Sequence, residues 1–413
     1  MSNPQNHQHS HPPKFNTDQP PVPSGSSCHG IRESGQALLL LLALIITLAF
    51  GFVFEFSRPT ALAIGHDKQT AAALAQAKDA LIGYAASDAN RPGELPCPDV
   101  DNDGASTPIS DYSGSNCINL VGRLPWKTLG LPDLRDGGGE RLWYALSNVY
   151  HAGATPPLTS DTLGQLTVTG SASATNVVAI VFSPGEVLNT QVRDPANENN
   201  VANYLEGENA NGDTIFTTGA ASATFNDRLL VITNADLMPV VEQRVAREII
   251  SILQSYKTAT AALGYNGGAG VYPWADISDD ISNNGYNRGR FPCKGATPEI
   301  WGPGPNGTPT LPNWLTNGCL VTPLSGWSKV IYYAAAQNQL DAGCSTCTAA
   351  TLSVNGVSGT ALVLLTPGAA GASPRGAWPT AYFEDSQNND DANDSYVTPS
   401  STAYDRDRLF KIP

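Results

Sequence analysis

The chain has 413 residues, which is enough for two or three globular domains with cores of their own. Its formal net charge is −14, from 23 Lys and Arg against 37 Asp and Glu. Because a protein that grips phosphates needs a basic face, this surplus of acid excludes nucleic acid as a partner. The 39 glycines and 31 prolines predict long loops between modest helices and strands.

The chain begins with a polar, proline-rich stretch that has no apolar periodicity. We expect residues 1–35 to be a disordered leader, because such a composition cannot bury enough apolar surface to fold. An uncharged apolar run then extends from Ala37 to Phe54. It is long enough to be a transmembrane helix, which we predict over residues 36–58.

A one-faced helix is predicted between Leu62 and Ser87, where apolar residues recur at a helical period: Leu74, Ala77, Leu81, Ile82 and Ala85. A loop with short proline turns follows it. The loop includes Leu95-Pro96-Cys97-Pro98-Asp99, Gly122-Arg123-Leu124-Pro125-Trp126 and Leu129-Gly130-Leu131-Pro132.

The polar leader that ends in glycine, the apolar run, the helix and these turns together resemble type IV prepilins and the pseudopilins of type II secretion. In that family a prepilin peptidase cuts after the glycine, and the apolar segment stays as a stem helix. The resemblance implies processing between Gly35 and Gln36, with a cut after Gly30 as the alternative. Most of the family has a glutamate five residues after the cut, where this chain has Leu40. The resemblance covers residues 36 to about 150.

The second half of the chain repeats motifs of the first half in the same order, at a spacing far longer than the 20 to 50 residues of solenoid repeats. We therefore predict two tandem copies of one domain, over residues 59–235 and 236–413. The matched motifs are Asn90–Cys97 with Asn287–Cys293, Leu142–Ala145 with Ile331–Ala334, Val181–Gly185 with Leu364–Gly368, Asn203–Glu206 with Ala381–Glu384, and Asn226–Ile232 with Arg406–Ile412.

Short apolar runs predict the strands of both copies: Val177–Phe182, Ala361–Leu365, Arg228–Ile232 and Arg408–Ile412. The second copy also has an opening helix, in which Val241, Val245 and Ile249 keep a helical period. The expected fold class is α+β: an N-terminal transmembrane stem helix that leads into two tandem pilin-like heads, each a helix packed on a small antiparallel sheet with long disulfide-stapled loops.

Six of the seven cysteines follow the apolar run and form local pairs: Cys97 with Cys117, Cys293 with Cys319, and Cys344 with Cys347. We interpret them as disulfides in an oxidising compartment, with buried free thiols as the alternative. With the apolar run, this predicts a single-pass protein of the bacterial inner membrane whose body lies in the periplasm or on the cell surface.

The sharpest short motif is Asp99-Val100-Asp101-Asn102-Asp103-Gly104. Carboxylates at alternate positions before a glycine can converge on one hard cation, so Asp99, Asp101 and Asp103 are candidate Ca²⁺ ligands. Ser110 stands where an EF-hand has its last glutamate, so this is not an EF-hand. The alternative is a solvated turn rich in Asp and Asn.

A catalytic site is not predicted. His151 is the only histidine after residue 66, which nearly excludes a nucleophilic triad that needs an imidazole base. Paired carboxylates could serve a glycosidase, and Glu206, Glu208, Glu384 and Asp385 recur at like positions, but we favour a structural role for them.

We therefore expect a non-enzymatic, membrane-anchored pilin-like protein, acting as a minor pilin or pseudopilin of a type IV pilus or type II secretion fibre. The expected partners are the inner membrane, a prepilin peptidase and other pilins or pseudopilins. The alternative is a surface adhesin or carbohydrate-binding protein with a pilin-like anchor.

Overall fold

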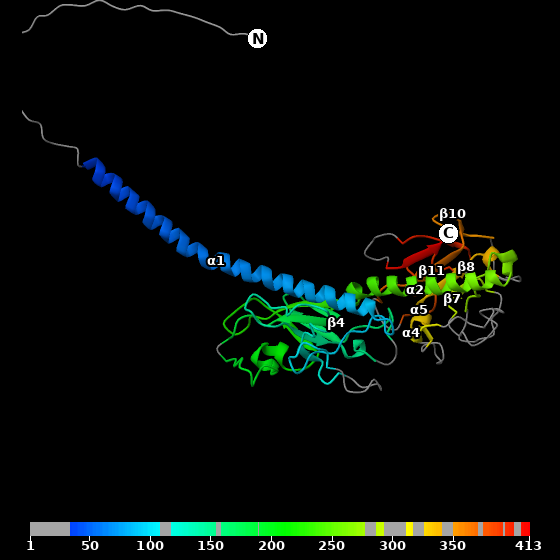
Figure 1. The fold of residues 1–413 in the computed structure, drawn as a ribbon, viewed down its shortest axis with the longest axis horizontal. Coiled ribbons are helices and arrows are strands. Elements are labelled where there is room, and N and C mark those ends of the chain that lie inside the picture. Colours follow the sequence, from blue (N-terminus) through cyan, green and yellow to red (C-terminus); the bar gives the residue numbers. More distant parts are fainter. Residues whose placement is uncertain are drawn as a thin grey trace, which may run out of the picture. The chain divides into compact units, whose positions relative to one another are not determined.

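The computed structural model describes residues 34–107, 117–153, 158–188, 190–276, 286–292, 311–316, 326–340, 350–370, 375–390, 393–399 and 406–413 (Figure 1). Within its first helix, the side chains of residues 34–37 and 49–62 are not part of that description. The chain forms two compact units, Met1–Leu62 and Ala63–Pro413.

Helix α1 runs from Ser34 to Ser87 and changes character along its length. Consecutive residues at its start are exposed, with Leu38 at 68% and Leu40 at 72%, so apolar side chains lie on every side of the helix there. Further along, only one face is buried, through Leu74, Ala77 and Leu81. This second part is the predicted one-faced helix, and it packs into the core of the body.

No helix in the described part of the chain combines the length and the apolar character that a membrane crossing requires. The predicted transmembrane segment over residues 36–58 and the single-pass inner-membrane localisation built on it are therefore wrong. An apolar run predicts a helix whose surface is covered by its surroundings, and a membrane is only one way to cover it.

The first half of the body is built on a six-stranded sheet. Its strands lie in the order β1-β2-β4-β3-β5, and β6 also pairs with β4. All pairs are antiparallel except β3 with β5. The strands are β1 (Val121–Arg123), β2 (Trp143–Leu146), β3 (Leu166–Gly170), β4 (Ala174–Ser183), β5 (Ile215–Thr218) and β6 (Arg228–Thr233), with short 3-10 turns η1 (Asn148–Tyr150), η2 (Val201–Asn203) and η3 (Gly207–Ala210).

The second half has a four-stranded sheet in the order β13-β11-β8-β7 and a three-stranded sheet in the order β10-β9-β12, in which β9 and β12 are parallel. The strands are β7 (Arg288–Arg290), β8 (Tyr332–Ala335), β9 (Leu352–Val354), β10 (Val357–Thr360), β11 (Leu362–Thr366), β12 (Ser395–Tyr396) and β13 (Arg408–Ile412). The remaining elements are α4 (Asn313–Thr316), α5 (Trp327–Val330), η4 (Tyr265–Gly268) and η5 (Gln337–Gln339).

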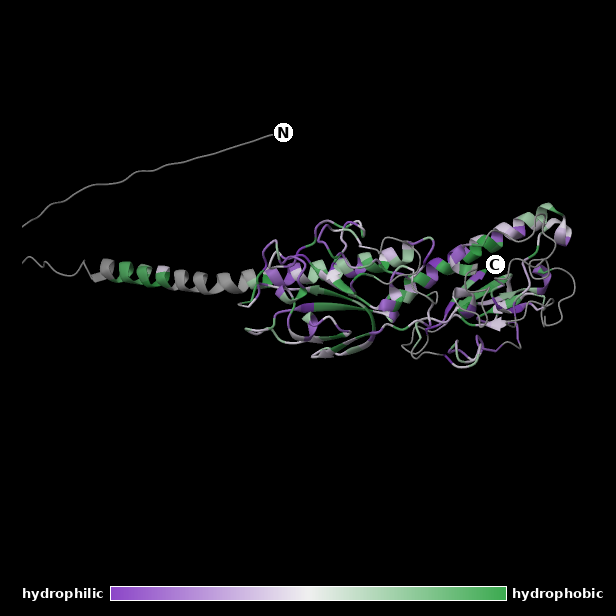
Figure 2. Ribbon diagram, turned by 90° about the horizontal axis from the view of Figure 1, so that it is seen from below, coloured by the Kyte–Doolittle hydropathy of each residue, from purple (hydrophilic) through white to green (hydrophobic). Residues whose placement is uncertain are grey.

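Helix α2 (Asn234–Ala262) connects the two halves. It follows β6 directly because Thr233 caps it: the Thr233 hydroxyl accepts from the backbone N–H of Asp236, whose carboxylate accepts from the Thr233 N–H in return. Lys78 of α1 lies 3.0 Å from the same carboxylate. The helix buries the apolar face that the sequence predicts, through Val241, Val245 and Ile249. The strands that Figure 2 colours as hydrophobic complete this core.

The predicted fold class is wrong. The described residues form three sheets, two of which contain a parallel pair, rather than a membrane stem that leads into two pilin-like heads, each with one small antiparallel sheet. The sequence reasoning missed the parallel pairs because an alternating pattern shows which face of a strand is buried and not the direction of its partner. The individual strand predictions at Val177–Phe182, Ala361–Leu365, Arg228–Ile232 and Arg408–Ile412 are confirmed within three residues at each end.

The two halves share one strand frame. The order β1-β2-β4-β6 in the first matches β7-β8-β11-β13 in the second. Arg123 lies opposite Trp143 in the first sheet, as Arg290 lies opposite Tyr332 in the second. Outside the strands, Asp99 pairs through its backbone with Arg123 and Asp276 with Arg290. One matched motif of the sequence is thereby corrected, because Asn287–Pro292 takes the place of residues 120–125 and not of residues 90–96.

Polar groups are buried where the two halves meet. The Glu242 carboxylate of α2 is fully buried and accepts from the hydroxyls of Ser160 in the first half and Thr366 in the second. Asp161 of the first half accepts from Arg375 Nε at 2.7 Å. One hydrophobic core also runs through both halves, so residues 63–413 pack as a single body.

Candidate functional site

The predicted processing and disulfide residues are only partly described. Gly35 and Gln36 lie in the first turn of α1, without described side chains. Cys97 and Cys117 form a disulfide with 5.5 Å between their Cα atoms, which closes the loop after α1. Four predicted disulfide residues lie outside the described residues: Cys293, Cys319, Cys344 and Cys347.

The aspartate loop, residues 99–104, brings its three carboxylates together. One oxygen from each of Asp99, Asp101 and Asp103 lies within 4.8 Å of the others. The loop turns sharply because Asn102 and Gly104 both have positive φ, at 60° and 88°. Asp99 is buried, and its Oδ2 accepts from the backbone N–H of Gly104 at 2.7 Å. The other two carboxylates are exposed, so the arrangement could receive a cation from solvent.

The loop rests on the segment that follows β1. Trp126 packs against Gly104, so closely that a side chain at position 104 would collide with the indole ring. The backbone N–H of Lys127 donates to the Gly104 carbonyl at 2.8 Å, and the Lys127 ammonium donates to the Asp103 carbonyl. Burial raises the pKa of Asp99 against the hydrogen bonds it accepts. A cation at this position would favour the ionised form.

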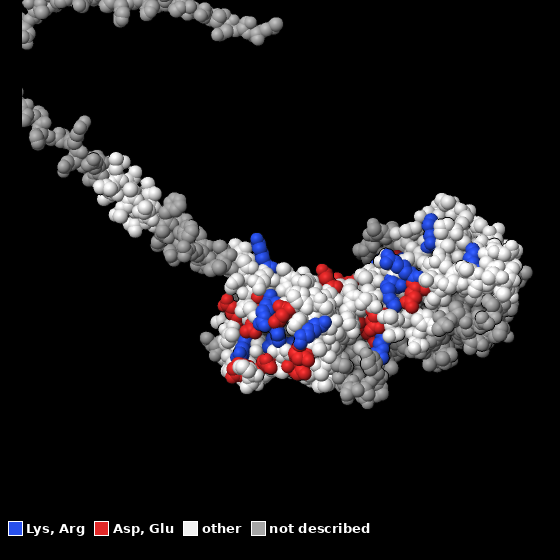
Figure 3. Space-filling view, in the orientation of Figure 1, with Lys and Arg blue, Asp and Glu red and all other residues white. Residues whose placement is uncertain are grey.

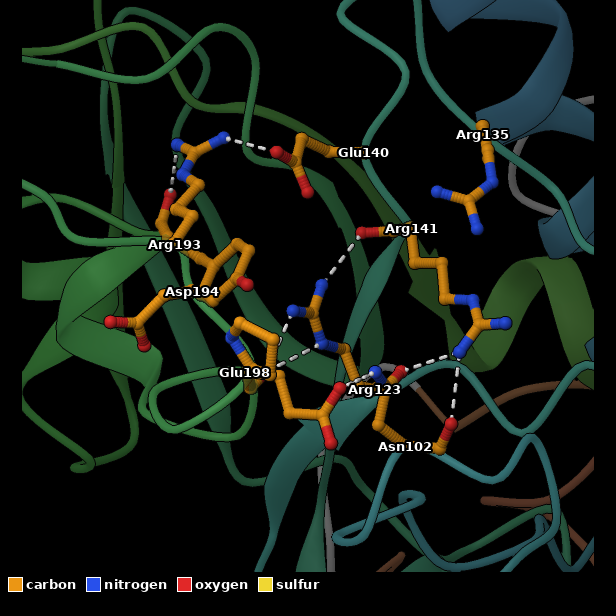
Figure 4. A pocket seen from close by; sticks show the side chains of 10 residues that line it. Asn102, Arg123, Arg135, Glu140, Arg141, Arg193, Asp194 and Glu198 are labelled. Atoms are coloured by element: carbon orange, nitrogen blue, oxygen red, sulfur yellow. Dashed lines mark hydrogen bonds and ion pairs between the residues drawn. The ribbon is translucent and has the colours of Figure 1, made fainter.

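A polar pocket of about 320 Å³ lies beside the aspartate loop, and Asn102 belongs to both (Figure 4). This volume is near the lower end of the range for small-molecule sites, about 300 to 1,000 Å³. We call it the arginine pocket. Its lining residues are Asn102, Arg123, Arg135, Glu140, Arg141, Arg193, Asp194, Pro195, Glu198 and Tyr204.

Arg123 forms the floor of the arginine pocket. Its guanidinium carbon lies 3.9 Å from the ring centre of Tyr204 and 4.3 Å from that of Trp143, which places it against two aromatic faces. The same group donates to the carbonyls of Arg141 and Glu198. Arg123 is 3% exposed, so burial lowers its pKa, although the group keeps its charge.

The other arginines of the pocket are also held by neighbours. Arg141 grips Asp133 with two donors, at 2.8 and 3.1 Å, and donates to Asn102. Burial opposes ionisation of Asp133, but the hydrogen bonds from Arg141 and Arg135 outweigh it and lower its pKa. Arg193 donates to the carbonyls of Gly185 and Asn203, in addition to its ion pair with Glu140. The guanidinium walls are therefore fixed before any ligand arrives.

Two carboxylates keep oxygens available to a ligand. Glu198 accepts from Asn102 Nδ2 at 2.9 Å through Oε2, and Glu140 contacts Arg193 at 3.4 Å through Oε1. Among the described residues, the second oxygen of each has no hydrogen-bond donor. Figure 4 shows both side chains among the arginines, with Asn102 joining Glu198 to Arg141. The pocket thus offers acceptors on a rigid polar frame.

The sequence reasoning missed the arginine pocket, whose residues come from the aspartate loop, β1 and three loops between residues 102 and 204. Of its lining residues, only Asn102 lay in a segment that the sequence predicted as a site, the cation loop. The recurring acids predicted for a glycosidase do not line the pocket. Glu206 instead bonds to the backbone of Asp227, and Glu208 is exposed. Charges of both signs alternate over the face that Figure 3 shows.

Comparison of the chain with known protein families, with characterised proteins and with solved structures finds no match in any of the three. The function is therefore argued from the site itself.

Proposed function

We propose that this chain is a non-enzymatic carbohydrate-binding protein of the adhesin type, with the arginine pocket as its ligand site. The observation that supports this most is the rigid polar frame of the pocket, in which the carboxylate oxygens of Glu140 and Glu198 remain free to accept. A sugar carries many hydroxyl groups, each able to donate one hydrogen bond and accept others. A few fixed polar groups in a concave site give such a ligand its orientation.

The state of the arginines favours a neutral ligand over a phosphate or carboxylate. An anion is recognised best by a guanidinium that offers two free donors in parallel. Arg141 already gives that fork to Asp133, and Arg123 and Arg193 donate to backbone carbonyls. An anion would have to displace these bonds. A hydroxyl that donates to Glu198 displaces nothing.

The same pairing argues against catalysis. A glycosidase needs one carboxyl group that is protonated near neutral pH, which an apolar setting provides. Glu140 instead lies beside Arg193, and Glu198 accepts from Asn102. Neither group therefore lies in the apolar setting that such an acid requires. We therefore assign both groups to binding.

Calcium is the proposed cofactor. The three carboxylates of the aspartate loop are hard oxygen ligands of the kind that Ca²⁺ prefers, and they converge within 4.8 Å. Asp99, Asp101 and Asp103 would hold the ion, which would neutralise their mutual repulsion. An ordered loop would keep Asn102 in place against Glu198 and Arg141, so calcium would support ligand binding without contacting the ligand.

A panel of immobilised monosaccharides and disaccharides tests the proposed ligand. We expect saturable binding to one or a few sugars, and a loss of at least about tenfold in Glu198→Gln, since an acceptor becomes a donor. Glu208→Gln is the matched control, because Glu208 is exposed outside the pocket. No binding by the natural chain, or equal binding by Glu198→Gln, would contradict the proposal.

A second candidate function is that of a subunit in a type IV pilus or type II secretion fibre. It is favoured by the first part of α1, where Leu38, Leu39 and Leu40 are 67% to 72% exposed on successive sides. A helix that is apolar all round requires neighbours that cover it. Helices of other subunits would do so in a fibre.

Sheared fibres test this second candidate. The chain should co-purify with them, and Leu40→Asp should abolish that co-purification while Val357→Asp, on the exposed strand β10, should not. Mass spectrometry of the N-terminus should find Gln36 first if a prepilin peptidase acts. An intact Met1 together with no fibre association would remove this function.

A further inference from the structure

A buried pair of carboxyl groups, Glu206 and Asp227, is connected to the arginine pocket. Glu206 follows the pocket residue Tyr204 by two positions, and Asp227 precedes β6. Glu206 is 8% exposed and Asp227 is 5% exposed. Two carboxylates buried side by side repel each other strongly unless one of them binds a proton.

The two groups clasp each other's backbone. Asp227 Oδ2 accepts from the Glu206 N–H at 2.9 Å, and Glu206 Oε2 accepts from the Asp227 N–H at 3.1 Å. Asn209 of η3 adds a further bond to Asp227 Oδ2 at 2.9 Å. The remaining oxygen, Asp227 Oδ1, is buried without a hydrogen-bond partner. A proton on Oδ1 would satisfy it by donating to the Glu206 carboxylate, with which Asp227 shares a side-chain contact.

The second half of the body repeats part of this arrangement at Asp407 and at Glu384, which is exposed. Asp407 Oδ1 accepts from the Glu384 N–H at 3.2 Å, and Glu384 Oε2 accepts from the Arg406 N–H at 3.1 Å. Asp407 Oδ2 is again buried without a partner. The same unsatisfied oxygen in both halves indicates a feature of the shared frame rather than an accident of one loop.

The first clasp connects to the arginine pocket through one side chain. Gln191 Nε2 donates to Glu206 Oε1 at 2.6 Å, and Gln191 Oε1 accepts from Arg193 at 2.6 Å. Arg193 in turn lies 4.9 Å from the ring centre of Tyr204. Glu206 therefore fixes both the loop that carries Tyr204 and the guanidinium beside it. Arg228, the next cation along the chain, is engaged with Asp67 at 2.7 Å.

We propose that Asp227 and Glu206 share one proton, and that this proton holds Tyr204 and Arg193 in the pocket wall, so that ligand binding weakens when the proton is lost. This inference rests on the proposed carbohydrate site. Burial, and next the nearby Glu206, raise the pKa of Asp227 to about 8, and the matching causes raise the pKa of Asp407 to about 8. Loss of the proton above that pH would set two carboxylates against each other and loosen the Tyr204 loop.

The experiment compares the natural chain with Asp227→Asn and Asp407→Asn. An asparagine copies the protonated state, because its amide donates where the carboxyl proton would. Binding to the sugar panel should fall at least about tenfold between pH 7 and pH 9 in the natural chain and in Asp407→Asn, and should stay constant in Asp227→Asn. Equal loss in Asp227→Asn would overturn the proposal, as would no loss in the natural chain.

Infrared difference spectra of the ligand-free proteins separate this inference from the carbohydrate site. The natural chain minus Asp227→Asn should show a protonated carboxyl band at pH 7 that disappears near pH 8, and Glu206→Gln should remove the same band. If no sugar binds at any pH but this band is present, the proton is shared and the assigned ligand is wrong. If the band is absent, the shared proton is refuted whatever the panel shows.

Discussion

The two halves of the body build different surroundings on one strand frame. Arg193 in the first half and Arg375 in the second both donate to the carbonyl of a Pro-Gly turn, to Gly185 and Gly368 respectively, and both lie over a tyrosine. In the first half this arrangement borders the arginine pocket. In the second half Trp378 lies between Arg290 and Tyr382, at 5.0 Å from the guanidinium and 4.9 Å from the ring.

This difference shows that one strand order can hold different side chains at matching places. Beside Arg290, the counterpart of Arg123, the second half places Trp378, which also contacts Tyr332 and Phe383. The two arginines also differ in their acidic partners. Arg375 forms an ion pair with Asp161 of the first half, whereas Arg193 forms one with Glu140 at the arginine pocket. We infer that the second half acts as a packed support and the first half carries the ligand site.

The largest expected effect on stability comes from removing the side chain of Arg375. Arg375→Ala leaves the 12% exposed carboxylate of Asp161 without its closest cation, which should lower the free energy of unfolding by about 3–5 kcal/mol. Arg193→Ala should lower it by about 1–3 kcal/mol, because the Glu140 left behind is more exposed, at 25%. Urea unfolding measures both. Sugar binding should be lost only in Arg193→Ala, and the reverse pattern would contradict the assigned roles.

A matched pair of asparagines tests whether the frame itself is equivalent. Asn209 exchanges two hydrogen bonds with the backbone of Thr217, and Asn388 does the same with Val397. Each alanine substitution should lower the free energy of unfolding by about 1–3 kcal/mol, since two half-buried backbone groups lose their partners. If the losses in the free energy of unfolding of the two variants differ by more than about 2 kcal/mol, the two asparagines do not stabilise their halves equally.

The paired acids predict an effect on stability that has a defined pH dependence. The folded-state pKa of Asp227 and of Asp407 is about 8, above the ordinary value of 3.8. The stability these groups contribute is therefore fully present below about pH 4 and is lost as the pH rises through 8. Relative to Asp227→Asn/Asp407→Asn, the melting temperature of the natural chain should decline across this window. A flat difference between pH 4 and 9 would refute the raised pKa values.

Much of the strand frame could be predicted from the sequence. The arginine pocket could not, because it depends on contacts between residues that are far apart along the chain. Apolar runs located β4, β6, β11 and β13, because a buried strand needs such residues. The equivalence of Arg193 and Arg375 was hidden, since they precede Tyr204 and Tyr382 at different spacings. The similar sequences around Pro96 and Pro292 suggested that these two segments are equivalent, which is wrong. The pairing of Arg290 with Tyr332 shows instead that Arg290 is equivalent to Arg123.

The candidate cation loop was visible in the sequence because its ligands are close together along the chain, unlike the residues of the arginine pocket.

The smallest expected effect concerns this aspartate loop. Calcium at 100 times its Kd should raise the free energy of unfolding by about 2.7 kcal/mol at most, and EDTA should reverse this. Asp101→Asn/Asp103→Asn should abolish the response, and Glu208→Gln should retain it. A melting temperature that is insensitive to calcium in the natural chain would dismiss the loop as a cation site.

The stoichiometry of sugar binding tests the central contrast between the two halves most directly. Isothermal titration with the best sugar of the panel should give one site per chain, and Glu198→Gln should abolish it while the fold, followed by circular dichroism, is kept. Two sites per chain, or one site that survives Glu198→Gln, would show that the first half does not carry the ligand alone.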